Sequence, residues 1–323
     1  MMMLKGLCRV LLMGVCLLLA CRMSAKSTPP TDPAAARVIP AFVVPANRPD
    51  VAHERFMVIG DMGTGRPSQH RVAAAMALRA REEPVDFILT VGDNFYLNGV
   101  QSSDDPQWQT KFEEVYSDPS LQVPFFPSLG NHDHYGNPQA QIDYGRNHPR
   151  WNMPAFHYTF TRELGDGTQV QFFAVDSNPI HEQDPAAAAQ LAWLDKQLAN
   201  SRARWKIVYG HHSLYGHNPR RGHNATMIAR LEPLLVKHGV DVYFAGHDHT
   251  LEMIKPIHGV HYVISGAAAG PDWAYSVNWT DESFYAATLG GFTLCTVSAN
   301  ALVVEFVRLD GRTQYAHTIT KHP

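Results

Sequence analysis

The sequence predicts an α/β fold in which two mixed β-sheets pack as a sandwich flanked by helices. Five apolar runs each end in glycine, as buried strands do where they reach the edge of a sheet. The first two runs enclose a helical pattern and so form a βαβ unit, whose crossover is expected to be right-handed. After His249 the chain becomes rich in β-forming residues, which supplies further strands for both sheets.

The elements of the βαβ unit can be placed by residue. The first strand ends at Gly60 and the second at Gly92. Between them, residues 68–83 carry apolar side chains at helical spacing, and Ser68 is the expected N-cap. A second helix is predicted over about residues 106–117, because its aromatic and aliphatic side chains fall on one face.

The next elements are a hairpin and two helices. Strands are predicted over residues 156–162 and 168–176, joined by a Gly-Asp-Gly turn. Leucines at i, i+3 and i+7 over residues 191–198 predict a third helix. A fourth helix is expected from Asn224 to His238, with Gly239 ending it as the C′ residue. The strand runs that follow read KPIHGVHYVIS, GGFTLCTVSA and ALVVEFVRL.

The N-terminal residues 1–20 are predicted to be a signal segment. A positively charged start precedes an apolar run of eleven residues, which fits a secretory signal and is too short to span a membrane. Residues 18–21 read LLAC, which resembles a bacterial lipobox and predicts a lipid anchor at Cys21. Cleavage after Ala25, which would release a soluble exported protein, is the alternative. The expected location is the periplasm or the outer membrane of a bacterium, or otherwise outside the cell.

Residues 21–50 are rich in Pro and Ala and are predicted to be a tether, leaving residues 51–323 as one catalytic domain. Only Cys295 lies in that domain, so it cannot form an internal disulfide. With 45% hydrophobic and 18% charged residues, the composition is that of an ordinary globular protein. The net charge of −3 and the lack of a basic cluster argue against nucleic acid as a partner.

A polar residue directly follows the glycine at the end of each of the five apolar runs. These residues are Asp61, Asp93, Asn131, His211 and His247. Ligands in α/β folds bind beyond the carboxyl ends of the strands, so the five side chains are expected to converge. Carboxylate, amide and imidazole groups without cysteine suit hard or borderline cations. The sequence therefore predicts a site for a pair of metal ions.

The motifs around these residues carry a family resemblance. They read GDMG from Gly60, GDNFY from Gly92, GNHD from Gly130, GHH from Gly210 and GHDH from Gly246. In this order and spacing they resemble the metallophosphoesterases. Tyr96, three residues after the second aspartate, narrows the resemblance to purple acid phosphatases. The stretches DNFYLNGVQ and GNHDHYGNPQAQIDY are similar to the small tartrate-resistant branch.

The resemblance covers about residues 54–310 and implies a calcineurin-like metallophosphoesterase fold with two metal ions. It implies that the first metal, Fe(III), is held by Asp61, Asp93, Tyr96 and His249. It implies that the second, a divalent Fe, Zn or Mn, is held by Asp93, Asn131, His211 and His247. Two properties of the donors agree: a carboxylate has two oxygens with which to bridge, and a phenolate suits a trivalent ion.

The activity implied is that of a metal-dependent acid phosphatase. Phosphate monoesters would be hydrolysed by in-line attack of a metal-bound hydroxide, with imidazolium groups protonating the leaving alkoxide. His132 is the expected proton donor, oriented by Asp133. The second donor is His223 or His217, with His223 preferred because it lies nearer the helix that follows.

The sequence leaves open the roles of three further residues and two other functions. His212 is not expected to be a ligand. Arg220 and Arg221 either attract substrate phosphate or are ordinary surface charges. A phosphodiesterase or nucleotide hydrolase on the same metal core is one alternative function, because the ligands alone do not select the ester. A non-catalytic surface lipoprotein is another.

Overall fold

A computed structural model describes residues 42–44 and 52–322 of the chain. The predicted signal segment and Cys21 lie outside these described residues. Within them, no helix is both long enough and apolar enough to cross a membrane. One described strand, β1 (Phe42–Val44), falls inside the segment predicted to be a tether and pairs in parallel with β5 (Tyr158–Glu163).

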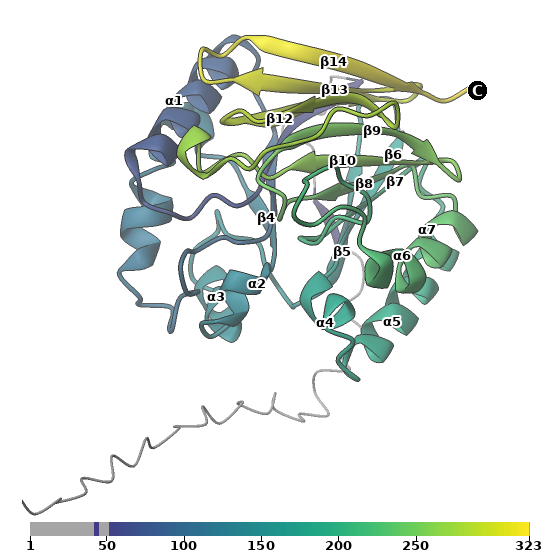
Figure 1. The fold of residues 1–323 in the computed structure, drawn as a ribbon, viewed down its shortest axis with the longest axis horizontal. Helices are drawn as coiled ribbons and strands as arrows, with labels where there is room; N and C mark the ends of the chain where they lie inside the picture. Colours follow the sequence, from purple (N-terminus) through teal and green to yellow (C-terminus); the bar gives the residue numbers. More distant parts are fainter. Residues whose placement is uncertain (1–41, 45–51, 323) are drawn as a thin grey trace, which may run out of the picture. The chain divides into compact units, whose positions relative to one another are not determined.

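Two mixed sheets form the core of the fold, as predicted (Figure 1). The eight-stranded sheet has the order β1, β5, β6 (Gln169–Ala174), β7 (Trp205–Tyr209), β8 (Val242–Ala245), β10 (Val260–Ser265), β9 (Leu251–Ile257) and β11 (Ser283–Ala287). The six-stranded sheet has the order β14 (Thr313–Thr320), β13 (Ala301–Arg308), β12 (Gly291–Ser298), β2 (His53–Ile59), β3 (Phe87–Val91) and β4 (Phe125–Ser128). The C-terminal hairpin of β13 and β14 forms one edge of the six-stranded sheet.

Parallel pairing in the middle of each sheet positions the site. Strands β2, β3 and β4 run parallel to one another, as do β6, β7 and β8. Parallel strands carry their carboxyl ends to the same edge of a sheet. The loops that leave these strands therefore start close together in each sheet.

Aromatic side chains fill the space between the sheets. The ring of Phe172 in β6 lies 5.4 Å from that of Phe56 in β2 and 5.3 Å from that of Phe87 in β3. All three side chains are fully buried. The neighbouring Phe173 points to the opposite face of its sheet, as alternation along a strand requires, and packs in a second apolar cluster.

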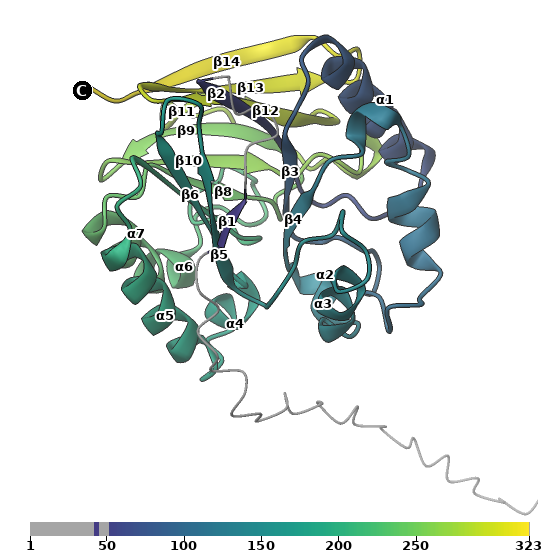
Figure 2. The same cartoon turned by 180° about the vertical axis from the view of Figure 1, so that it is seen from behind.

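Helices cover the outer faces of both sheets (Figure 2). Helix α1 (Pro67–Glu82) lies against the six-stranded sheet and packs its buried face into the main core. Helices α5 (Ala187–Asn200), α6 (Ala225–Arg230) and α7 (Glu232–Lys237) cover the eight-stranded sheet. Three short helices, α2 (Asn131–His134), α3 (Gln139–Gly145) and α4 (Ser177–His181), follow strands β4 and β6.

The first two predicted helices need correction. Helix α1 begins at Pro67 with Arg66 as N-cap, so the expected cap at Ser68 is wrong. Proline is favoured at the first helical position, because its fixed φ suits the helix and the N–H it lacks would have no helical partner. The helix predicted over residues 106–117 is reduced to a π-helical segment, Gln109–Glu113, although Phe112 is buried as expected.

The predicted fourth helix is two helices. The Asn224 side chain caps α6 as expected, accepting a hydrogen bond from the Met227 N–H at 3.2 Å. The helix breaks at Leu231, because Pro233 lies in the first turn of α7 and has no N–H to continue the ladder. Gly239 ends α7 with a φ of 60°, as the sequence predicted.

A buried ion pair joins the two sheets. The Nε atom of Arg162 in β5 donates to Oε1 of Glu54 in β2 at 2.7 Å. The two side chains are 1% and 3% exposed. The guanidinium also lies 5.3 Å from the centre of the Phe87 ring in β3. This cation therefore contacts both sheets at once.

We expect Arg162→Met to lower the free energy of unfolding by about 3–5 kcal/mol, because it removes the cation facing the buried Glu54 carboxylate. The double variant Glu54→Leu/Arg162→Met should recover most of this loss, since it buries no charge at the pair. Urea unfolding of the wild type and of the variants measures both effects. A single-variant loss below about 1 kcal/mol would show that the pair does not matter for stability.

Candidate metal centre

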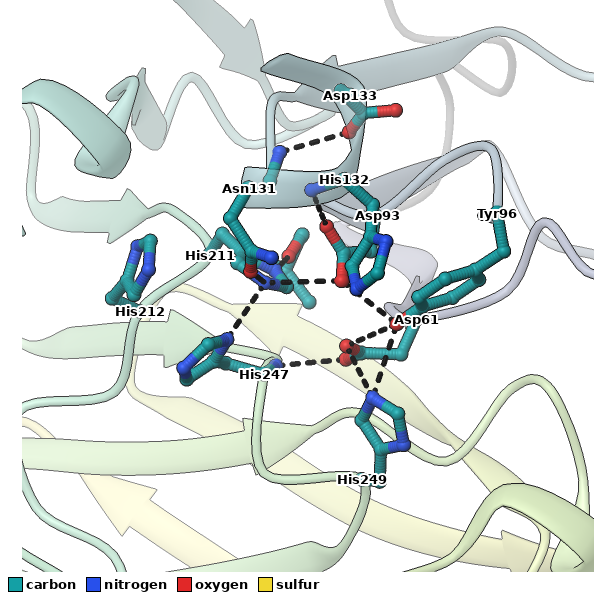
Figure 3. Close-up of polar contacts among 12 residues, drawn as sticks. Asp61, Asp93, Tyr96, Asn131, His132, Asp133, His211, His212, His247 and His249 are labelled. Carbon is teal, nitrogen blue, oxygen red and sulfur yellow. Dashed lines mark hydrogen bonds and ion pairs between the residues drawn. The ribbon is translucent and has the colours of Figure 1, made fainter. Parts of the chain in front are cut away.

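The five strand-end residues converge, as the sequence predicted. Asp61, Asp93 and Asn131 follow β2, β3 and β4 of one sheet. His211 and His247 follow β7 and β8 of the other. Figure 3 shows these side chains gathered in one place together with Tyr96 and His249. The structure thus brings together all seven residues that the sequence analysis assigned to metal ions.

Glycine precedes these residues because the side chains and strands crowd there. A Cβ atom at Gly92 would lie 2.7 Å from the His211 side chain, and its φ of +83° favours glycine in any case. A Cβ atom at Gly246 would lie 2.6 Å from Asp61 Oδ2. The glycines therefore let the two sheets bring their polar residues within contact distance.

One half of the site is centred on the hydroxyl of Tyr96. This oxygen lies 2.9 Å from Asp61 Oδ1, 2.8 Å from Asp93 Oδ2 and 3.0 Å from His249 Nε2. His249 Nε2 is also 3.2 Å from Asp61 Oδ1. These four atoms are those expected to hold the first metal.

The other half is centred on His211. Its Nε2 atom lies 3.1 Å from Asn131 Oδ1, 3.1 Å from His247 Nδ1 and 3.4 Å from Asp93 Oδ2. The oxygen Asp93 Oδ2 therefore faces both halves. Its second oxygen, Oδ1, accepts the His132 backbone N–H at 2.9 Å. The structure therefore directs one oxygen of Asp93 at both halves of the site and the other at the backbone, which differs from the expectation that each oxygen would serve one metal.

Backbone carbonyls orient two of the imidazoles. His211 Nδ1 lies 2.9 Å from Val91 O, and His249 Nδ1 lies 2.7 Å from Trp273 O. A carbonyl only accepts, so each Nδ1 carries a proton and each Nε2 is the atom directed at the site, where a metal ion would replace any proton bound to it. Outer hydrogen bonds of this kind fix imidazole ligands in metalloproteins.

The backbone is strained at four of the seven residues. Asp61, Asp93, His247 and His249 have φ values of 56°, 53°, 69° and 53°. Residues with a Cβ atom rarely adopt this left-handed region, and it costs on the order of 1–3 kcal/mol each. Such strain persists where the surrounding structure enforces it, and it clusters at functional sites.

Burial and charge shift the pKa values in the site. Burial, with Asp61 and Asp93 adding to it, raises the pKa of Tyr96 far above its ordinary value. The phenol therefore donates a hydrogen bond unless a cation compensates the negative charges. Burial, His212 and His211 lower the pKa of His247, which keeps that ring neutral and able to bind a metal. Burial lowers the pKa of His211, but Asp93 overrides this and raises it.

Asp133 has a different role from the one expected. Its buried carboxylate accepts from the N–H groups of Gly130 at 2.8 Å and Asn94 at 3.1 Å. It accepts further bonds from Phe95 N at 3.2 Å and Gln141 Nε2 at 2.9 Å. The carboxylate thus joins the loops after β3 and β4, and it does not orient the His132 ring.

The His132 ring is held by other groups. Its Nδ1 lies 2.6 Å from the carbonyl oxygen of Leu97. Its ring packs against Tyr96 at 4.5 Å and Tyr135 at 5.2 Å between centroids. The partly exposed His132 side chain thus lies at the rim of the first half of the site.

The two candidates for the second proton donor both face Glu282. His217 Nε2 and His223 Nε2 lie 3.1 and 3.2 Å from Glu282 Oε2. His217 Nδ1 also contacts Glu252 Oε2 at 3.1 Å. His223, unlike His217, lines a cavity of about 310 Å³ that it shares with His247.

Three further residues pack around the ligands, and two of them, Trp273 and Tyr275, were not identified from the sequence. The ring of His212, which was not expected to be a ligand, packs 4.4 Å from His181 in α4 and 4.4 Å from His247. Tyr275 stacks on His249 with centroids 4.4 Å apart. Trp273 acts through its carbonyl oxygen. A backbone or stacking role leaves no mark in a sequence motif, so spacing alone cannot reveal these two aromatic residues.

Oxygen and nitrogen donors gathered at the strand ends of a two-sheet α/β fold are the arrangement that a metal-dependent hydrolase requires. The chain belongs to the calcineurin-like phosphoesterase family, whose model matches residues 54–251. This result confirms the predicted fold and the predicted class, a metal-dependent phosphatase.

The relatives agree with the resemblance seen in the motifs. Tartrate-resistant acid phosphatase type 5 of Oryctolagus cuniculus is 33% identical over 296 residues, covering 83% of this chain and 91% of the relative. Purple acid phosphatase 7 of Arabidopsis thaliana is 33% identical over 236 residues, covering 66% of this chain and 70% of the relative.

Solved structures share the fold. The structure titled "GAP50 the anchor in the inner membrane complex of Plasmodium" superposes with a TM-score of 0.75 and 27% identity, covering 84% of this chain and 90% of the other. A purple acid phosphatase from yellow lupin, at 19% identity and a TM-score of 0.65, covers 84% of this chain and 54% of the other. At that identity the likeness concerns the fold alone.

The contact between His217 and Glu252 predicts a pH dependence. The hydrogen bond that His217 donates to the Glu252 carboxylate raises the pKa of His217 against the effect of burial, and Glu282 adds to this increase. A histidine whose pKa is raised in the folded state contributes its full stabilisation of the fold below the unfolded pKa of about 6.5. This contribution is lost as the pH rises through the folded-state pKa. Glu252→Gln should therefore destabilise the protein more at about pH 5.5 than at about pH 8.5.

Urea unfolding at both pH values measures this difference. Glu282→Gln is the matched control, because Glu282 is 60% exposed and water screens its interaction with His217. We expect the control to give a smaller change with pH. An equal stability loss for Glu252→Gln at both pH values would contradict the assignment.

Proposed function

We propose that this protein is an acid phosphatase that hydrolyses phosphate monoesters at a dinuclear centre. The ligands proposed for Fe(III) are Asp61, Asp93, Tyr96 and His249. The ligands proposed for a divalent Fe, Zn or Mn are Asp93, Asn131, His211 and His247. The observation that carries the proposal is the position of Asp93 Oδ2, which is 2.8 Å from Tyr96 Oη and 3.4 Å from His211 Nε2.

The buried charges of the site support a cationic occupant. Asp61 and Asp93 are 0% and 1% exposed. Within residues 52–322, neither carboxylate forms an ion pair with a lysine or an arginine. Buried carboxylates without a cation are costly, and metal ions are one of the groups that compensate them. The ligand atoms of Asp61, Asp93 and His211 all lie within 4.8 Å of one another.

The donor types support different ions in the two halves. A phenolate is a hard anionic donor and suits a trivalent ion, whereas imidazole and amide groups suit a borderline divalent one. Tyr96 belongs to one half, and His211, His247 and Asn131 to the other. When bound, such ions neutralise phosphate charge and lower the pKa of water, the trivalent ion more strongly, which favours hydrolysis below pH 7.

Histidines beside the centre would protonate the leaving group. His132 lies at the rim beside Tyr96, and its Nδ1–H is directed at Leu97 O, which leaves Nε2 to carry a proton to the departing oxygen. Asp133 would support this step by holding the loops that carry Asn131 and His132. We assign the second donor to His223, because it lines the cavity that contains His247.

Other functions on the same fold are less well supported. A phosphodiesterase or nucleotide hydrolase would use the same metal ions, and the donor set does not separate it from a monoesterase. The Plasmodium structure is titled as an anchor, so a non-catalytic binding protein is a second reading of the fold. The complete donor set at the strand ends of this chain favours catalysis. From the sequence LLAC at residues 18–21, we also propose that the protein is exported and carries a lipid at Cys21.

Tyr96→Phe tests the Fe(III) assignment. Iron-loaded wild type should be pink to purple, through charge transfer from phenolate to iron. The variant should lose that absorption band and keep its fold, because the buried ring is retained. Part of the activity should persist, since Asp61, Asp93 and His249 remain. A wild type that is colourless with iron in both redox states would rule out Tyr96 as a ligand.

Asp93→Asn tests the shared ligand. The amide keeps an acceptor for the His132 N–H but removes the charge that faces both halves. We expect loss of both metals and a fall in kcat/KM of at least about 100-fold. Metal analysis and hydrolysis of phenyl phosphate measure this loss. Asp195→Asn, at a surface carboxylate that is 39% exposed, is the matched control. Two metals per chain with near-normal turnover would refute the shared role.

A further inference from the structure

Two arginines lie over one aromatic ring beside the metal centre. The guanidinium carbons of Arg220 and Arg221 are each 5.6 Å from the centre of the Tyr275 ring. Both arginines come from the loop between β7 and α6, and Tyr275 comes from the segment between β10 and β11. Cations over an aromatic face are held there by the ring quadrupole. The Tyr275 ring therefore holds two positively charged side chains close to each other.

Tyr275 is itself fixed against the centre. Its ring stacks on His249, with centroids 4.4 Å apart and planes 5° apart, and its N–H donates to the His249 carbonyl at 3.3 Å. His249 Nε2 is 3.0 Å from the Tyr96 hydroxyl in the first half of the site. The Tyr275 ring therefore lies between the two arginines and His249, one of the residues proposed to hold Fe(III).

Arg221 also reaches the second half. It lines the cavity of about 310 Å³ that contains His247 and His223. The sequence alone could not separate a surface charge from a substrate contact at this residue. Its place in the same cavity as a proposed ligand favours the substrate contact.

The charges of the pair are poorly compensated. Arg221 Nε is 4.0 Å from Asp248 Oδ1, at the limit of an ion pair. Asp248 directs its other oxygen to Ser213 Oγ at 2.8 Å. For Arg220, no ion pair with a carboxylate is present in the described part of the chain. Two adjacent guanidinium groups repel each other, and an anion between them would bind both.

We propose that Arg220 and Arg221 form a subsite for a second anionic group carried by the leaving group of the substrate. This inference rests on the proposed phosphatase function. The ester phosphate belongs at the centre, where Asp93 faces both halves, whereas the arginines are separated from His249 by the Tyr275 ring. The preferred substrates are therefore phosphate monoesters whose leaving group bears its own phosphate or carboxylate.

Paired substrates test the subsite in the full-length, metal-loaded protein. Phenyl phosphate is compared with 4-carboxyphenyl phosphate, and propane-1,3-diol monophosphate with its bisphosphate. The two pairs distinguish a carboxylate from a phosphate as the second anion. Wild type should prefer the substrate with the extra anion in at least one pair. Arg220→Ala/Arg221→Ala should raise KM for that substrate about 10-fold or more and change KM for its partner less than about threefold.

Two further variants separate charge from structure. Arg220→Lys/Arg221→Lys should restore part of the preference, because the charge is kept but the planar fork is lost. Arg66→Ala is the matched control: its guanidinium lies 5.0 Å from the Trp273 ring in the same segment as Tyr275, and it should leave the preference unchanged. Metal content and thermal unfolding verify that each variant is folded and loaded.

The outcomes are distinct. An equal rise in KM for both members of a pair would mean that the arginines bind the ester phosphate, and would overturn the inference. Equal use of both members by the wild type would overturn it as well. Failure of the metal-loaded wild type to hydrolyse any of the four esters would instead overturn the proposed function.

Discussion

The buried carboxylate of Asp93 is the constraint on which the rest of the site depends. One oxygen accepts the His132 N–H at 2.9 Å, and this bond leaves the other oxygen facing both Tyr96 and His211. The carboxylate is almost fully buried, and its own backbone has a φ of 53°. A charge held this rigidly away from water needs a cation nearby. The two sheets provide the remaining donors because their parallel strands end at the same place.

Much of the fold and of the metal centre follows from local sequence signals. Each apolar run that ends in glycine is a strand, and the residue after each glycine reaches the site, because the carboxyl ends of parallel strands share an edge. Asn224 starts a helix because its side chain accepts a backbone N–H of the first turn, and Gly239 ends one because its positive φ suits a residue without a side chain. These features depend on neighbours in the sequence, which is why the sequence predicts them well.

The features that the sequence did not predict depend on contacts between distant segments. Asp133 accepts from Asn94 and Phe95, which lie in a different loop, so its partners cannot be inferred from the GNHD motif. Tyr275 and Trp273 meet His249 only through tertiary packing and carry no motif. The pairing of Arg220 and Arg221 over Tyr275 depends on the same packing. The break at Leu231 is different, since the proline that causes it is visible in the sequence.

The central proposal is that the carboxylate of Asp93 would help to hold both metal ions and so join them into one catalytic centre. The decisive measurement is a titration of the metal-free protein with iron and then with zinc. Phenyl phosphate hydrolysis and the amount of bound metal are both followed during the titration. We expect little activity at one equivalent of metal and a steep rise as the second ion binds. Full activity with one bound metal per chain would contradict it.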